Sequence, residues 1–300
     1  MSVCAAAMPC SAARSQSSSW IATKRCFRGG VRITTDEAVL LGREARYWGD
    51  REYVEIRGDA DYTHRPYRIT ADQLGYYLDD KEVVATGYPV LVDSSSTLSA
   101  DTVYYYEDRE LGDARGHAFL DNRSDSLTIN SQRLFYLAGQ DSLQATGDAY
   151  LVKRDAAQDT IFTILSDSLS LESGYFFAWR NVVLTHGTAR GVCDRAVFQQ
   201  EEDLAIMEGA PELRDGNYIL TGTQFNLHLD GGELNSIFIP AEPRFTQHDS
   251  IGDTTFTDWL DGTQMAVEFV GGKAREVTVV GQASSYYNLL ENQVFEGANQ

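Results

Sequence analysis

A short pattern recurs nine times along this chain and limits what it can fold into. Each copy joins two apolar strand-like segments through a glycine or its replacement, one further residue, and Ala or Pro. The clearest copies are centred on Gly58, Gly87, Gly116, Gly147, Gly209 and Gly281, and the weaker ones on Gly30, Arg180 and Ala241. Successive centres are 28, 29, 29, 31, 33, 29, 32 and 40 residues apart. Such a period is typical of stacked supersecondary units.

Each repeat contains two halves that read as strands. After the glycine segment comes a polar turn, such as Asp79-Asp80-Lys81, and then a segment whose apolar residues alternate, as in Ile69, Ala71, Leu74 and Tyr76. Because successive side chains of a strand point to opposite faces, this alternation buries one face and exposes the other. Helical periodicity is hard to find. The sequence therefore predicts an all-β array of about nine repeats with two strands each.

The domain organisation follows from where this pattern holds. No Pro- or Ser-rich linker interrupts residues 30 to 287, so we expect one repeat domain over residues 29–300. Residues 1–28 lack the alternation and an intact export signal, since no basic residue precedes the short apolar stretch. They are predicted to be a leader, disordered or an incomplete export region. The chain stops where a strand is expected to start, which predicts a C-terminal truncation or an edge that another chain completes.

Composition and motifs exclude several function classes. The formal net charge of -19 argues against a nucleic-acid partner. There is no nucleophile elbow, no His-Glu-x-x-His and no phosphate-binding glycine loop, so we expect neither an enzyme nor a cofactor. No metal site is predicted, because the five histidines are scattered and no Cys or His completes a zinc spacing. Each histidine is expected to be exposed or hydrogen-bonded in a structural role. The single cysteine of the array, Cys193, implies no disulfide framework.

An aspartate recurs after the small residue that begins a strand half, at Asp72, Asp101, Asp167 and Asp194. Repeated carboxylates suit calcium, but the calcium-binding β-helix signature of closely spaced glycines is missing. A side-chain hydrogen bond to nearby backbone is the favoured interpretation.

Three segments carry a resemblance to a known family. They are Ile-Thr-Ala-Asp-Gln-Leu-Gly-Tyr (residues 69–76), Leu-Ser-Ala-Asp-Thr-Val-Tyr-Tyr (98–105) and Val-Val-Ala-Thr-Gly (83–87). Taken in series they resemble the OstA-like (organic solvent tolerance) family of lipopolysaccharide-transport proteins, over residues ~30 to 300. Residues 234–245 and 277–287 resemble the longer members of the Bacteroidetes type.

That resemblance implies a β-jellyroll, or β-taco, of two facing antiparallel sheets whose apolar slot holds acyl chains. It implies a periplasmic or outer-membrane-associated protein that bridges the membranes in outer-membrane assembly. The implied partners are lipopolysaccharide or a related lipid, and other jellyrolls of this family that join through open sheet edges. Two alternatives remain: a structural or glycan-binding β-solenoid, and the N-terminal soluble domain of an outer-membrane translocon.

The slot itself can be assigned from the alternating apolar positions. If each repeat adds one strand per sheet, nine repeats at ~4.8 Å per strand give a trough roughly 40 Å long. An open slot admits water, so Asp in place of Leu134 or Leu204 is expected to leave the fold intact. The predicted lipid-slot residues are Ile69, Leu74, Val83, Leu98, Val103, Leu127, Leu134, Leu143, Leu169, Leu204, Ile206, Leu227, Ile237, Val267, Val277 and Val279.

Overall fold

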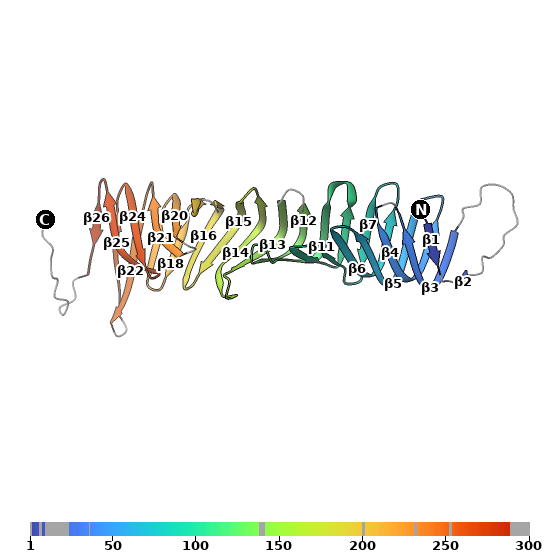
Figure 1. Cartoon of the computed structure of the whole chain (residues 1–300). Coiled ribbons are helices and arrows are strands. Elements are labelled where there is room, and N and C mark those ends of the chain that lie inside the picture. Colours follow the sequence, from blue (N-terminus) through green and yellow to red (C-terminus); the bar gives the residue numbers. More distant parts are fainter. Residues whose placement is uncertain are drawn as a thin grey trace. The chain divides into compact units, whose positions relative to one another are not determined.

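Antiparallel β-strands account for most of the chain (Figure 1). The computed structural model describes residues 2–5, 8–9, 24–35, 37–137, 142–199, 202–230, 233–251 and 254–288, and these contain no α-helix. The all-β prediction is confirmed. The strand pairings observed are antiparallel. A β-solenoid of parallel coils therefore does not describe the fold.

The chain divides into two compact units, Met1–Ser173 (unit 1) and Gly174–Gln300 (unit 2). The strands of unit 1 are β1 (Ser2–Ala5), β2 (Met8–Pro9), β3 (Lys24–Thr34), β4 (Val39–Trp48), β5 (Tyr53–His64), β6 (Tyr67–Tyr77), β7 (Glu82–Thr86), β8 (Val90–Val92), β9 (Ser96–Ser99), β10 (Thr102–Tyr106), β11 (Leu111–Asn122), β12 (Leu127–Leu137), β13 (Ser142–Arg154) and β14 (Thr160–Glu172). One 3-10 turn, η1, covers Glu107–Arg109.

Unit 2 continues the same design. Its strands are β15 (Tyr175–His186), β16 (Ala189–Gln199), β17 (Leu204–Glu208), β18 (Glu212–Asp215), β19 (Tyr218–Thr221), β20 (Gln224–Asp230), β21 (Glu233–Ile239), β22 (Arg244–Ile251), β23 (Thr254–Asp261), β24 (Gln264–Val270), β25 (Lys273–Val280) and β26 (Ser284–Tyr286).

Every long strand contributes to two sheets. In β5, residues 53–57 pair with residues 73–77 of β6, and residues 60–64 pair with residues 67–71 after a register shift. We call the layer of residues 53–57 sheet I and the layer of residues 60–64 sheet II. Shorter strands belong to one layer: β7 and β10 pair in sheet I, and β8 and β9 in sheet II. Unit 2 has two layers of its own, to which we give the same names: its sheet I contains β17, β20, β21, β24 and β25, and its sheet II contains β18, β19, β22, β23 and β26.

The recurrent glycine pattern lies where the chain passes between the two sheets, a line that we call the seam. At Gly116 φ is +74° and at His117 it is +46°, so two successive residues adopt the left-handed conformation. The copy centred on Arg180 has no glycine and does the same, with φ of +60° at Arg180 and +52° at Asn181, whereas the copy centred on Ala241 has one left-handed residue, Glu242, with φ of +52°. Two such residues form a β-bulge that bends the strand sharply. The motif therefore encodes the turn from one sheet into the other.

Replacing Gly87 with Ala is expected to lower the free energy of unfolding by about 3 kcal/mol. Gly87 has a φ of +75°, and an added Cβ would lie 2.6 Å from the Cβ of Asp72. Gly30 provides the control, because its φ is +84° but no atom lies within 4 Å of the place that an added Cβ would take. Gly30→Ala is expected to cost about 1 kcal/mol, from the backbone alone. Urea unfolding measures both, and equal losses would contradict a role for the Asp72 contact.

The hairpin turns lie at the ends of the strands away from the seam. In unit 1 the turns at 49–52, 78–81 and 107–110 form the rim of sheet I, and those at 65–66, 93–95 and 123–126, together with residues 35, 37 and 38, form the rim of sheet II. The space between the two rims is called the mouth.

The two sheets face each other across an apolar interior. Tyr62 of sheet II packs against Tyr76 and Tyr105 of sheet I, with ring centroids 5.8 and 6.1 Å apart. In unit 2, a Cβ placed on Gly191 of sheet II would lie 2.9 Å from the Met207 side chain of sheet I. The fold is thus a jellyroll-like repeat array, in agreement with the sequence prediction.

Charged groups occupy the outer faces. Asp113 of β11 lies between Arg115 and Arg133, with Nη2 to Oδ2 distances of 2.6 and 2.8 Å. Burial alone would raise the pKa of Asp113, but the hydrogen bonds from Arg133 and Arg115 outweigh it and lower that pKa. The acidic composition is therefore compatible with an apolar interior.

The predicted leader overlaps the first strands. β3 begins at Lys24 and pairs with β4, and β1 and β2 pair with β3. Backbone pairing explains the difference, since it does not require the apolar alternation that the prediction used. The disorder predicted for the remainder of residues 1–28 lies outside the described residues.

Candidate lipid slot between the sheets

Most of the predicted slot residues face the interior. In unit 1 all of them are at most 4% exposed, namely Ile69, Leu74, Val83, Leu98, Val103, Leu127, Leu134, Leu143 and Leu169. In unit 2, Leu227, Ile237 and Val267 are buried as well. Val277 and Val279 lie opposite Val267 and Met265 on the interior side, but they are half-exposed. Their strand, β25, pairs only with β24 within the described residues.

The prediction for Leu204 and Ile206 is wrong. Both are half-exposed, whereas Ala205 and Met207 of the same strand are buried. Ala205 lies opposite Leu227, and Met207 lies opposite Phe225. All four residues from 204 to 207 are apolar, so the alternation does not say which pair points inward. The pairing with β20 decides it.

The interior of unit 1 is filled rather than open. Leu134, Leu74, Val83 and Leu98 are fully buried. A Cβ on Gly112 of sheet I would lie 3.3 Å from Leu98 Cδ2 of sheet II, so the Leu98 side chain reaches across to the backbone of sheet I. The expectation that Asp could replace Leu134 without unfolding is therefore not supported by this packing.

Tyrosine–carboxylate contacts close the mouth of unit 1. The Tyr62 hydroxyl of sheet II donates a hydrogen bond to Glu107 on the rim of sheet I. Tyr136 of sheet I donates to Asp93 on the rim of sheet II at 3.2 Å. Burial, followed by the Glu107 contact, raises the pKa of Tyr62, so its hydroxyl stays protonated and keeps donating. Tyr67 also donates to Glu110, at 3.4 Å. An ion pair crosses the mouth as well, with Lys81 Nζ 3.2 Å from Glu37 Oε2.

The mouth of unit 2 differs, because a cavity of about 670 Å³ occupies it. Leu213 and Tyr218 line it from sheet II, and Leu234 and Phe269 from sheet I. The turns at 187–188, 216–217 and 271–272 also line the cavity. The cavity opens to solvent at these turns, because their residues 187, 188, 216, 271 and 272 are exposed. This is the position at which an apolar chain could enter between the sheets.

Polar groups hold the sheet II side of this cavity in place. Tyr218 Oη donates to Asp215 Oδ2 at 2.7 Å, and Thr188 Oγ1 donates to Asp215 Oδ1 at 2.6 Å. Burial, followed by the Asp215 hydrogen bond, raises the pKa of Tyr218. Lys273 and His186 lie at the rims, where the Lys273 ammonium group can meet an anionic headgroup. The cavity therefore combines apolar walls with a polar entrance.

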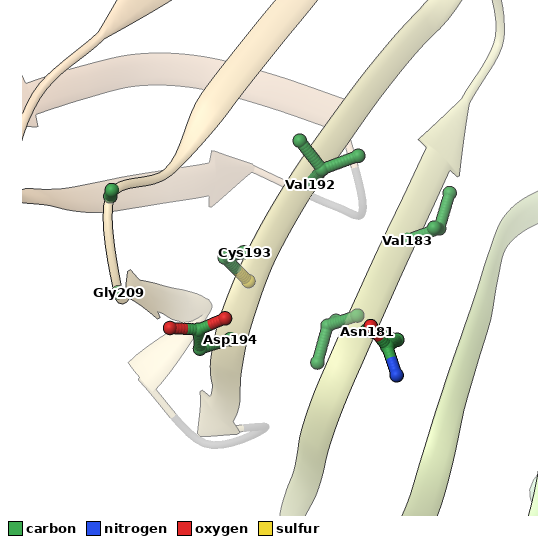
Figure 2. Close-up of a pocket in the computed structure, with 8 residues that line it drawn as sticks. Asn181, Val183, Val192, Cys193, Asp194 and Gly209 are labelled. Atoms are coloured by element: carbon green, nitrogen blue, oxygen red, sulfur yellow. The ribbon is translucent and has the colours of Figure 1, made fainter.

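A second kind of pocket lies on the seam. Figure 2 shows one of about 330 Å³, where Asp194 lies between Cys193 and the Gly209 segment, and Asn181 lies on the neighbouring strand. Cys193 is 8% exposed, and its thiol donates to the Arg195 carbonyl oxygen at 3.2 Å. Burial raises the pKa of this thiol to about 11, so it is a poor nucleophile near neutral pH. Asp194 and Asn181 lie beside the valines of this hollow, so it suits an acyl chain less well than the cavity of unit 2 does.

The recurrent aspartates belong to the seam. The backbone N–H groups of Asp72 and Asp101 donate to the carbonyl oxygens of Gly87 and Gly116, at 3.0 and 2.8 Å. Asp101 Oδ2 lies 2.9 Å from His117 Nδ1. The Asp194 side chain lies against Gly209, and Asp167 lies in β14 where that strand crosses the seam. These positions connect neighbouring repeats, and each belongs to a different repeat.

The sequence analysis did not identify the groups that meet across the mouth of unit 1, notably Glu37, Glu107 and the tyrosines Tyr62, Tyr67 and Tyr136. Three histidines have the hydrogen-bonded role expected for them: His64 with Tyr105 at 3.3 Å, His117 with Asp101, and His248 with Thr257 at 3.1 Å. Within the residues that the structure describes, no helix is long and apolar enough to cross a membrane. No protein-family model matches the chain, and no curated protein matches it either.

Proposed function

We propose that this chain is a periplasmic lipid-transport protein of the lipopolysaccharide-transport type. It shields the acyl chains of lipopolysaccharide or a related lipid between its two sheets and helps to bridge the inner and outer membranes. The observation that supports this proposal most directly is the unit 2 cavity. Residues of both sheets line it, and it opens to the surface at the mouth. Its volume of about 670 Å³ lies within the roughly 300–1,000 Å³ usual for small-molecule sites.

The family resemblance of residues 69–76, 83–87 and 98–105 supports the same function, because those segments lie in strands of the two-sheet array. Strand edges that lack a neighbour readily accept another strand. Edge-to-edge pairing with other jellyroll proteins is therefore part of the proposal, as the means by which a bridge would form.

Binding of a fluorescent fatty acid to the purified full chain tests this function. We expect saturable binding that lipopolysaccharide displaces and that a sugar without acyl chains does not displace. Displacement by free fatty acid but not by lipopolysaccharide would assign the slot to a simpler lipid. A folded protein that binds no amphiphile would overturn the proposal.

A further inference from the structure

Three side chains of the kinds that bind metal ions, two glutamates and one histidine, meet at the mouth of unit 1. Glu37 comes from the turn between β3 and β4, His64 from the end of β5, and Glu107 from η1. One ligand atom from each lies within 4.8 Å of the other two. Glu37 is exposed, His64 is half-buried and Glu107 is 5% exposed. Glu37 and His64 belong to the rim of sheet II, whereas Glu107 belongs to the rim of sheet I.

Groups around these three side chains already orient them. The Tyr62 hydroxyl donates to Glu107 Oε1, and Tyr76 is also hydrogen-bonded to this carboxylate. The two oxygens of a carboxylate offer about four lone-pair sites, so Glu107 can accept both hydrogen bonds and still bind a metal. The Tyr105 hydroxyl lies 3.3 Å from His64 Nδ1, which leaves Nε2 available. Metal-binding histidines and carboxylates are commonly held by such outer partners.

Lys81 is the one cation in contact with this group among the described residues. Its Nζ lies 3.2 Å from Glu37 Oε2 and 3.0 Å from Asp108 Oδ1. When Glu37 turns toward a metal, Asp108 remains as the partner of Lys81. Glu37 can therefore become a ligand without leaving the Lys81 ammonium group unpaired.

We propose that Glu37, His64 and Glu107 bind a divalent transition metal of the zinc class and that this metal clasps the two rims of unit 1. Imidazole nitrogen with carboxylate oxygen is a ligand set that suits zinc, whereas calcium and magnesium prefer oxygen alone. Tetrahedral bonds of about 2.1 Å place ligand atoms about 3.4 Å apart. Binding would thus draw the rims slightly together. This inference does not depend on lipid binding.

Zinc titration of the chelator-treated full chain by isothermal calorimetry tests the clasp. Cys4, Cys10 and Cys26 are replaced by Ser in every protein compared, because thiolates also bind zinc. We expect one equivalent of zinc that the His64→Ala and Glu107→Gln variants bind at least tenfold more weakly. Zinc should also raise the melting temperature of the parent protein. Glu107→Gln keeps an oxygen acceptor for Tyr62, so the fold should persist, as circular dichroism can verify.

His117→Ala is the matched control, because His117 pairs with Asp101 at 2.9 Å but belongs to no three-ligand group in the described residues. It should bind zinc as the parent does. Absence of zinc binding by the folded parent, or equal binding by His64→Ala and Glu107→Gln, would overturn the proposal. Tighter binding of calcium than of zinc would overturn the assigned metal class.

Discussion

Asp in place of Leu134 is expected to unfold unit 1. Leu134 is fully buried in β12, between β11 and β13. A carboxyl group there lacks a partner, and with the lost packing we expect a cost of at least about 4 kcal/mol. Because proteins are commonly stable by only about 5–15 kcal/mol, a cost of this size removes a large fraction of the stability of the unit or all of it. Urea unfolding of the full chain measures the effect, and limited proteolysis shows whether cleavage falls within residues 24–173.

Leu165→Asp is the matched control in the same unit. Leu165 of β14 is 41% exposed and lies opposite Tyr150, which is also exposed. The same substitution there should cost about 1 kcal/mol or less. A similar small cost is expected for Leu204→Asp on the outer face of unit 2. A folded and stable Leu134→Asp protein would show that the unit 1 interior admits water, contrary to its packing.

Trp in place of Leu234 is expected to block the unit 2 cavity and to weaken binding of a fluorescent fatty acid at least tenfold, or about 1.4 kcal/mol. Leu234 is half-exposed and lines the cavity from sheet I, so a larger ring would occupy the space without disturbing a fully buried position. Fluorescence titration measures the affinity.

Leu204→Trp makes the same change on the outer face of the same unit, so it should leave the affinity unchanged. Equal losses in the two variants would place the lipid elsewhere. Unchanged affinity in the Leu234→Trp variant would show that the cavity is not the binding site, even if the protein binds lipid.

The sequence predicted the repeat array because two simple signals agree in it. The glycine pattern marks one passage across the seam in most repeats, and the alternation of residues such as Ile69 and Leu74 marks the buried face. The meaning of the glycine pattern was not predictable, since pairs of left-handed residues such as Arg180 and Asn181 are a matter of backbone conformation. At Leu204 to Met207 the alternation was ambiguous, and only the register with β20 resolves it.

The closed mouth of unit 1 could not be predicted for a different reason. Tyr62 and Glu107 are 45 residues apart, and Tyr136 and Asp93 are 43 residues apart. These separations correspond to about one and a half repeats, which places one partner on each rim. Aligning the sequence with a period of ~30 residues compares equivalent positions of the repeats. It therefore does not reveal contacts such as these, which join non-equivalent positions.

Photo-crosslinking from inside the cavity tests the central claim most directly. A benzophenone amino acid is placed at Phe269, which is 6% exposed and lines the cavity, or at Phe177 of β15, whose ring stacks on Tyr175 and Trp179. If acyl chains lie between the sheets, lipopolysaccharide should crosslink from position 269 and not from position 177. A protein that binds lipopolysaccharide but crosslinks it equally from both positions, or only from 177, would contradict the account.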